Sequence, residues 1–193
     1  MEAAATSERV AFLRAWKRDV RAVGSILPSS AGISRKMAAL LGAERLTNVA
    51  EMGAGTGPVT RALLDAMPAE GRLWSFEIDP VLAAGLRERF DDPRLTVVAE
   101  SASEAPRIAR EARLDGFDGI VSAIPYTLLP RQTALDLLDA HRRALLPGAP
   151  LVLIQYRPEY IVPFLRRLFG GFERHFYLWN VPPGFLFRVR RPR

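Results

Sequence analysis

The chain of 193 residues contains no cysteine, which excludes disulfide bonds and thiolate metal sites. It has only two histidines, His141 and His175, so we expect no bound metal ion. No uncharged apolar run reaches the ~18 residues that a membrane-spanning helix needs. The N-terminus also lacks an apolar core before a small-residue cleavage site. We therefore expect a cytoplasmic protein that is soluble or attached peripherally to a membrane.

Acidic residues are fewer than basic ones, with 21 Asp and Glu against 27 Lys and Arg and a net charge of +6. A basic surface favours anionic partners, and nucleic acid and an anionic membrane surface both qualify. Hydrophobic residues make up 49% of the chain and charged residues 25%, as in ordinary globular proteins. The length allows one full domain with a sizeable core.

Apolar runs alternate with helical patterns along the chain, which is typical of a parallel α/β sheet. The expected strands are Leu46–Met52, Leu73–Ile78, Leu95–Ala99, Gly116–Ala123, Ala149–Tyr156, Phe172–Trp179 and Phe185–Arg190. The expected helices are Glu8–Val23, Arg35–Leu41, Val59–Met67, Pro80–Phe90, Ser103–Arg113 and Arg131–Leu146. The pattern predicts a Rossmann-like, seven-stranded and mostly parallel sheet with an antiparallel C-terminal hairpin, and a ligand crevice at the carboxyl ends of its strands.

A glycine-rich turn follows the first expected strand, in the sequence Glu51-Met52-Gly53-Ala54-Gly55-Thr56-Gly57. Glycines let the backbone turn tightly and approach a ligand closely. Glu77 follows Gly57 by 77 − 57 = 20 residues, the distance at which an acidic side chain meets ribose hydroxyls in a Rossmann-type site. The glycine-rich turn, together with the acidic residue Glu77 at the end of the second expected strand, therefore predicts a pocket for a nucleoside cofactor.

The details of the turn favour S-adenosylmethionine over a dinucleotide. Pro58 stands where the dinucleotide fingerprint requires Gly or Ala, and no Gly-Lys-Ser/Thr follows to form a phosphate-binding loop. S-adenosylmethionine has no phosphate and carries an ammonium and a sulfonium. An acidic residue such as Glu51 beside the turn suits those charges.

The expected helix Glu8–Val23 is amphipathic and basic. Its apolar face carries Phe12, Trp16, Val20 and Val23 at three- and four-residue spacing, with Leu13 at the border. The opposite side carries Arg9, Arg14, Lys17, Arg18 and Arg21. Such a helix suits an anionic membrane interface. The alternative, a lid helix that buries the same face in its own domain, fits the pattern equally well.

Four segments together resemble bacterial phospholipid N-methyltransferases over nearly the whole chain. They are Trp16-Lys17 with Ala22-Val23-Gly24-Ser25-Ile26-Leu27-Pro28-Ser29-Ser30, Glu51–Gly57, Val121-Ser122-Ala123-Ile124-Pro125, and Asn180-Val181-Pro182-Pro183-Gly184. The resemblance implies a class I methyltransferase domain at residues 31–193, preceded by a membrane-binding and cofactor-covering segment at residues 1–30. It implies a peripheral enzyme that moves methyl groups from S-adenosylmethionine to the amine of phosphatidylethanolamine and its mono- and dimethyl forms, giving phosphatidylcholine.

The resemblance also implies which residues hold the cofactor. The residues Glu51, Gly53, Ala54, Gly55, Thr56 and Gly57 would surround its methionine portion, with Ser122 and Ser25 nearby. Glu77 would hold the ribose and Ile78 would lie against the adenine. The family usually has Gly-Asp-Ala after the third strand, whereas this chain has Glu100-Ser101-Ala102, so Ser101 or Glu100 would replace the aspartate. The membrane-binding residues would be Phe12, Leu13, Arg14, Trp16, Lys17, Arg18, Val20 and Arg21.

The acceptor site is expected to contain aromatic rings, because methylated amines are bulky cations that suit aromatic faces. Tyr126 is the first candidate, since it follows the fourth strand, and Tyr156 and Tyr177 come next. His175 is a candidate proton acceptor. For all of these, core or rim packing is the alternative role.

Three other functions compete with this one. The segment Ala123-Ile124-Pro125-Tyr126 is close to the Asn-Leu-Pro-Tyr of rRNA adenine dimethylases, but Ala123 occupies the position of the asparagine that would orient a flipped base. A small-molecule N-methyltransferase would not need the basic helix, and a non-catalytic adaptor would not need Glu51 and Glu77. We expect a phospholipid substrate, no nucleic-acid partner, and a monomer or weak oligomer.

Overall fold

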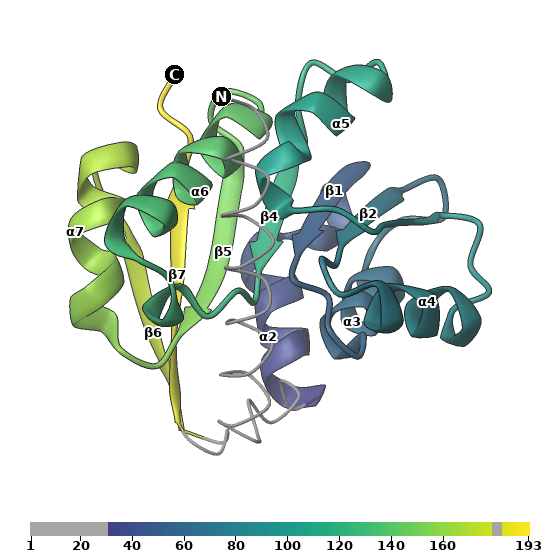
Figure 1. The fold of residues 1–193 in the computed structure, drawn as a ribbon, viewed down its shortest axis with the longest axis horizontal. Helices are drawn as coiled ribbons and strands as arrows, with labels where there is room; N and C mark the ends of the chain where they lie inside the picture. The colour runs from purple at the N-terminus through teal and green to yellow at the C-terminus, as the bar shows by residue number, and fades with distance from the viewer. Residues whose placement is uncertain (1–30, 179–182) are drawn as a thin grey trace, which may run out of the picture.

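The structure is a computed structural model, and it describes residues 31–178 and 183–193 (Figure 1). Its centre is a seven-stranded sheet in the order β3-β2-β1-β4-β5-β7-β6. The strands are β1 Asn48–Met52, β2 Arg72–Phe76, β3 Leu95–Val98, β4 Gly119–Ser122, β5 Pro150–Gln155, β6 Glu173–Tyr177 and β7 Gly184–Arg190. The helices are α2 Ala31–Leu41, α3 Pro58–Ala66, α4 Pro80–Arg89, α5 Ala105–Glu111, α6 Arg131–Ala144 and α7 Pro158–Phe169, with short 3-10 turns η1 Ala43–Arg45, η2 Ala102–Glu104 and η3 Tyr126–Leu128.

The strand directions confirm the predicted fold class. Strands β3, β2, β1, β4 and β5 are parallel, whereas β7 pairs antiparallel with both β5 and β6. The direction in which the chain adds strands reverses between β1 and β4. From β1 the sheet continues to β2 and β3 on one side, and from β4 it continues to β5 on the other side. In open α/β sheets the ligand crevice lies at such a switch point, outside the carboxyl ends of the strands.

Side chains alternate between two faces along each strand, and helices cover both faces (Figure 1). On one face, a core that includes Val49, Leu73 and Val121 packs against α2, α3 and α4. On the other face, a core that includes Ala50, Trp74 and Ile120 packs against α5, α6 and α7. We call these the α3 face and the α6 face. Burial on both faces explains why the central strands are almost wholly apolar.

Helix α7 was not predicted, because Pro158 and Pro163 interrupt the helical pattern in this segment. Pro158 occupies the first turn, where a missing N–H costs nothing. Pro163 lies inside the helix and removes one backbone donor. Burial of Ile161, Phe164, Leu165 and Phe169 on the α6 face offsets that loss.

Several boundaries differ from the sequence prediction. Helix α2 begins at Ala31 rather than Arg35, and β4 begins at Gly119 rather than Gly116. Phe117 instead forms an isolated bridge with Leu145. The expected amphipathic helix Glu8–Val23 and Ser25 lie outside the described residues. Among the described residues, no helix has the length and apolar character needed to cross a bilayer.

Candidate cofactor and acceptor site

The turn between β1 and α3 depends on three glycines in the left-handed region. Gly53, Gly55 and Gly57 have φ values of 78°, 57° and 92°. A Cβ on Gly57 would lie 2.5 Å from the Phe90 ring, whereas a Cβ on Gly55 would meet no atom within 4 Å. Position 57 therefore requires glycine for two reasons, the positive φ angle and the contact with Phe90. At position 55, by contrast, the absence of a side chain leaves open space beside the turn.

Four backbone amides of this turn donate to acceptors within the protein. Gly53 and Ala54 both donate to the carbonyl oxygen of Phe76, at 2.9 and 3.1 Å, and Gly57 donates to Ala54 at 2.9 Å. Gly55 donates to Oε2 of Glu77 at 2.8 Å. A phosphate-binding loop instead directs its amides at the ligand. The observed hydrogen bonds fit a cofactor without phosphate.

Glu51 is a fully buried carboxylate on the α3 face. In the parallel register it lies directly beside Ser75 of β2. Its Oε2 accepts hydrogen bonds from Oγ1 of Thr60, at 2.7 Å, and from Oγ of Ser75, at 2.6 Å. Its Oε1 is buried without a hydrogen-bond partner in the protein. Burial raises the pKa of the Glu51 carboxyl to about 7, although the two hydroxyls lower it in part.

Thr60 and Ser75 are the site residues that the sequence analysis missed. Ser75 is a polar residue between the buried Trp74 and Phe76, and its pairing with Glu51 could be found only from the strand register. Thr60 lies in the first turn of α3 and is fully buried, so it lies close to Glu51 once α3 packs on the sheet.

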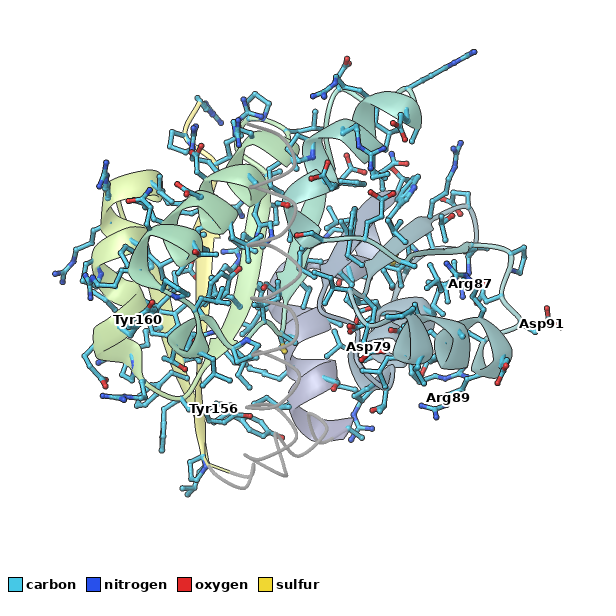
Figure 2. The ribbon with its side chains drawn as sticks, viewed as in Figure 1. Asp79, Arg87, Arg89, Asp91, Tyr156 and Tyr160 are labelled. Carbon is cyan, nitrogen blue, oxygen red and sulfur yellow. The ribbon has the colours of Figure 1, made fainter. Side chains whose placement is uncertain are left out.

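Glu77 joins the end of β2 to the glycine turn. One carboxylate oxygen accepts from the Gly55 amide, and the other accepts from the Asp79 amide at 2.9 Å. Asp79 in turn caps the N-terminus of α4 by accepting from Val81 at 2.8 Å, and its position is shown in Figure 2. Burial raises the pKa of Glu77, and the two backbone donors oppose that rise. Ile78 follows as a half-buried residue.

The residues after β3 are engaged with their own neighbours. Ser101 caps η2, where its hydroxyl accepts from the Ser103 amide at 3.3 Å and lies 2.8 Å from the Ser103 hydroxyl. Glu100 forms an ion pair with Arg107. Ala102 is buried in the core of the α6 face. Both candidates for the missing aspartate therefore already have a partner inside the protein.

Tyr126, the first candidate for the acceptor site, lies in the core. Its ring is 0% exposed. Its hydroxyl lies 3.0 Å from Oγ of Ser122 and 3.0 Å from Nδ1 of His141. Burial lowers the pKa of His141 to about 3 and raises that of Tyr126, so both side chains are neutral near pH 7. This group holds η3 against α6, and it engages the Ser122 hydroxyl away from the crevice.

Tyr156 and Tyr177, by contrast, lie near each other on the α3 face, partly buried against its core. Tyr177 pairs with Gly184 across β6 and β7, and a Cβ on Gly184 would lie 3.3 Å from the Tyr156 ring. Tyr156 follows β5 at the carboxyl edge of the sheet (Figure 2). His175 is half-exposed, with Nε2 at 3.7 Å from Oε2 of Glu173. The structure thus brings Tyr156 and Tyr177 together and separates them from Tyr126.

These features fit S-adenosylmethionine. The buried, unpartnered oxygen of Glu51 could meet a cation, the space at Gly55 could admit a ligand, and the turn donates its amides internally. The fold and this turn define a class I S-adenosylmethionine-dependent methyltransferase.

Comparisons with known proteins agree with that class. No family model matches the chain. It is 30% identical over 173 residues to an ornithine lipid N-methyltransferase from Singulisphaera acidiphila, covering 89% of this chain and 90% of that protein. A local match, 39% identical over 70 residues, joins it to ribosomal RNA small subunit methyltransferase H from Halorhodospira halophila, but this covers 35% of the chain and 22% of the relative. The chain therefore belongs to the lipid N-methyltransferase family.

Solved structures share the fold at low sequence identity. The N-methyltransferase NodS from Bradyrhizobium japonicum, in complex with S-adenosylhomocysteine, gives a TM-score of 0.67 at 19% identity, covering 84% of this chain and 87% of that one. The 1,6-didemethyltoxoflavin-N1-methyltransferase from Burkholderia thailandensis gives 0.66 at 20% identity, covering 97% and 90%. S-adenosylmethionine is accordingly the cofactor of this chain.

Proposed function

We propose that this protein transfers the methyl group of S-adenosylmethionine to the headgroup amine of a membrane lipid, namely phosphatidylethanolamine and its mono- and dimethyl forms. The observation that carries the lipid substrate is the match to a lipid N-methyltransferase over about nine-tenths of both chains. The four motifs that resemble phospholipid N-methyltransferases support phosphatidylethanolamine as the headgroup.

The proposed cofactor site follows from the geometry of the glycine turn. The residues Gly53, Ala54, Gly55, Thr56 and Gly57 border the methionine portion of the cofactor, and the unpartnered oxygen of Glu51 attracts its positive charge. The Glu77 carboxylate receives the ribose hydroxyls, Ile78 contacts the adenine, and Ser101 and Ala102 border the base. Ser122 is proposed to border the cofactor through its backbone, because its hydroxyl is bonded to Tyr126.

The proposed reaction needs orientation more than acid–base machinery. The amine lone pair attacks the methyl carbon as the carbon–sulfur bond breaks, and S-adenosylhomocysteine leaves with the electron pair. An alkylamine has a pKa near ~10, so it must lose a proton to water before attack, and burial favours its neutral form. Tyr156 and Tyr177 offer aromatic faces to the methylated cation, and holding the amine in line with the sulfonium supplies most of the rate.

Membrane attachment is proposed through residues 8–23. Phe12, Trp16 and Val20 would enter the interface, while Lys17 and Arg18 would meet anionic headgroups. Trp16→Ala, or Lys17→Glu with Arg18→Glu, should weaken binding to anionic vesicles and leave cofactor affinity unchanged. Equal loss of both properties would contradict the anchor role.

Ornithine lipid is the second candidate acceptor, because the 30% identical relative carries that name. It also presents a primary amine, but beside a carboxylate rather than a phosphate. RNA is a third acceptor to be tested, because of the local match to an rRNA methyltransferase.

The test measures transfer of labelled methyl groups from S-adenosylmethionine to four parallel acceptors. These are vesicles of phosphatidylethanolamine with phosphatidylglycerol, vesicles of ornithine lipid with phosphatidylglycerol, vesicles of phosphatidylglycerol alone, and total RNA. Label in phosphatidylethanolamine, with mono- and dimethyl products, is the expected result. Label in ornithine lipid alone would keep the lipid class and change the headgroup. Label in RNA alone would contradict the proposal.

A further inference from the structure

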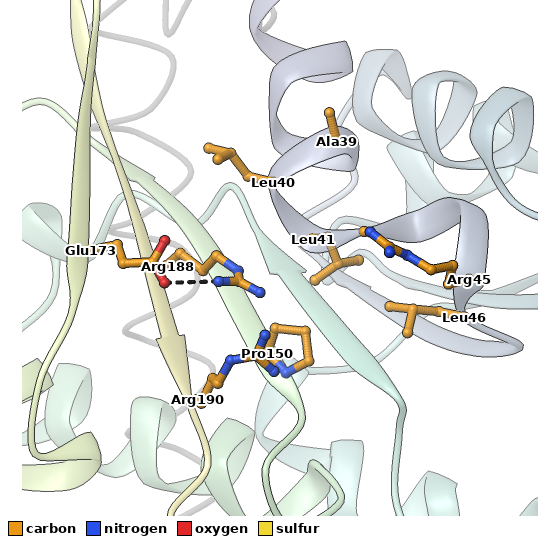
Figure 3. A pocket seen from close by; sticks show the side chains of 10 residues that line it. Ala39, Leu40, Leu41, Arg45, Leu46, Pro150, Glu173, Arg188 and Arg190 are labelled. Carbon is orange, nitrogen blue, oxygen red and sulfur yellow. Dashed lines mark hydrogen bonds and ion pairs between the residues drawn. The ribbon is translucent and has the colours of Figure 1, made fainter.

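A cavity of about 430 Å³ lies at the amino edge of the sheet, opposite the proposed cofactor crevice. Pro150, the first residue of β5, and Leu41, the last residue of α2, form part of its wall. The charged residues that line it are Arg45, Arg188, Arg190 and Glu173 (Figure 3). None of these residues belongs to the proposed methyl-transfer site. The size lies in the range of small-molecule sites.

The fold explains why three arginines meet at this position. Arg188 and Arg190 are two residues apart on β7, so their side chains share the face that α2 covers. Arg190 pairs with Pro150 of β5 and Arg188 pairs with Glu173 of β6. Gly42, with φ of 80°, ends α2 and turns the chain into η1, which carries Arg45. Figure 3 shows Arg188 extending from β7 toward Leu41 and Arg190 extending toward Pro150.

The charges of this cavity are not balanced by its own residues. Nη1 of Arg188 lies 2.8 Å from Oε1 of Glu173, and Nη1 of Arg190 donates to the Gly148 carbonyl at 3.0 Å. Arg45 pairs with Glu44, which does not line the cavity. Three guanidinium groups therefore face one carboxylate, and the excess positive charge attracts an anion.

One arginine donor in this cavity has no acceptor. Nε of Arg188 is buried and has no hydrogen-bond partner. A buried donor without a partner destabilises a fold unless something satisfies it, so such groups are rare. Nε–H and one Nη–H of a guanidinium form the fork that binds two oxygens of a phosphate together. A ligand oxygen in the cavity would satisfy the Arg188 donor.

We propose that this cavity binds the phosphate group of a small molecule, with Arg188 as the central ligand and Arg45 and Arg190 as flanking cations. The apolar wall formed by Leu41 and Pro150 would contact the rest of that molecule. Strand β5 separates the cavity from the cofactor edge by six residues, or roughly 17 Å. A flat bilayer against the cofactor edge would lie away from the cavity, which favours a soluble phosphate ester over a lipid headgroup. The phosphate site itself does not depend on the proposed function, but the choice of a soluble ester rests on the membrane attachment proposed there.

The test follows the Arg188 Nε–H resonance by NMR in the ¹⁵N-labelled full chain. Inorganic phosphate, glycerol phosphate and, as an ionic-strength control, sodium chloride are added separately. We expect a saturable shift with the two phosphates and none with chloride. Arg45→Gln, an exposed substitution, should weaken phosphate binding at least threefold. Arg188→Lys, which keeps the charge and loses the fork, should weaken it further. Because this variant lacks the Nε–H group, its binding is followed by the backbone amide resonances of the cavity residues Leu41 and Leu46. The matched control Arg72→Gln, exposed at the same sheet edge and outside the cavity, should leave it unchanged.

Two results would overturn the proposal. One is a shift that rises linearly with phosphate. The other is a shift that Arg72→Gln weakens as much as Arg45→Gln does. Vesicles with and without phosphatidylglycerol test the source of the phosphate. A response of Arg188 to phosphatidylglycerol vesicles and to neither soluble phosphate would support the phosphate site and assign it to a lipid headgroup. S-adenosylhomocysteine binding, measured in parallel, shows that each variant is folded.

Discussion

Two polar groups are buried on opposite faces of the same sheet, and they differ in charge. On the α3 face, the Glu51 carboxyl accepts from Thr60 and Ser75, and one oxygen has no partner. On the α6 face, Tyr126 bonds to both Ser122 and His141, and Nε2 of His141 is likewise buried without a partner. The first group can carry a charge near pH 7, because burial raises the pKa of Glu51 to about 7. The second group stays neutral there.

The difference teaches how a site can be distinguished from a core network. A hydroxyl and an imidazole that are neutral and bonded to each other suit the interior. A buried carboxyl with a free oxygen is costly unless a cation or donor meets it. The Glu51 group also lies beside the glycine turn, whose open space is at Gly55. We infer that the α3-face group serves the cofactor and that the α6-face group serves the fold.

The largest expected effect comes from Glu51→Gln on stability. The folded-state pKa of Glu51 is raised from 4.5 to about 7, so the folded protein holds a proton that the unfolded chain has lost between these values. The free energy of unfolding therefore falls as the pH rises from 4.5 to 7, by about 3 kcal/mol in all. Glutamine does not ionise, so the Glu51→Gln variant should not show this fall in the free energy of unfolding. Urea unfolding should show Glu51→Gln more stable than wild type at pH 8 by up to this amount, and close to wild type at pH 4.5. A difference independent of pH would contradict the raised pKa.

Glu77→Ala should have the next largest effect, on cofactor affinity. It removes the acceptor for the Gly55 and Asp79 amides and the proposed ribose ligand. We expect a loss of about 2 kcal/mol, roughly thirtyfold in Kd, because hydrogen bonds to charged groups are involved. Calorimetry with S-adenosylhomocysteine measures the change. Glu70→Ala, an exposed acid before β2, is the matched control and should bind normally. Unchanged affinity for Glu77→Ala would rule out its ribose role.

Tyr126→Phe should destabilise the fold and spare the cofactor. It leaves Nδ1 of His141 and the Ser122 hydroxyl without their shared partner, at a cost of about 1–2 kcal/mol. Cofactor affinity should stay within about twofold, since Tyr126 is part of the core. Tyr160→Phe, which loses one bond to the Leu129 carbonyl at a half-buried position, is the comparison variant and should cost less. A large loss of affinity in Tyr126→Phe would erase the distinction between the two faces.

The smallest effect is expected from Ser101→Ala. The Ser101 hydroxyl is already bonded within its own turn, to Ser103. Its loss should weaken cofactor binding by less than about threefold, with a similarly small loss of stability from the η2 cap. A tenfold loss would instead assign Ser101 to the adenine, in place of the usual aspartate.

The sequence predicted the sheet well because its signals are local. Apolar strands and the glycine turn each act within a few residues. The structure confirms the seven strands and the antiparallel C-terminal pair. It also places Glu51 and Glu77 at adjoining strands, on either side of the glycine turn.

The remaining features depend on contacts that no short window contains. The partner role of Ser75 requires the β1–β2 register, and the burial of Tyr126 requires α6 to pack over it. Helix α7 was missed because local proline signals outweigh an apolar face whose burial is tertiary. The arginine cavity joins α2 to β6 and β7, which lie far from α2 in the sequence.

The measurement that tests the account most directly is proton release on cofactor binding. At pH 7 the Glu51 carboxyl is about half protonated in the free protein, and a cation beside it favours the charged form. Calorimetry of S-adenosylmethionine binding in buffers of different ionisation enthalpy should therefore show release of up to about half a proton by wild type. The Glu51→Gln variant should not show this release, whereas Tyr126→Phe should retain it. Equal proton release by wild type and Glu51→Gln would contradict the claim that the buried carboxyl of the α3 face meets the cationic cofactor.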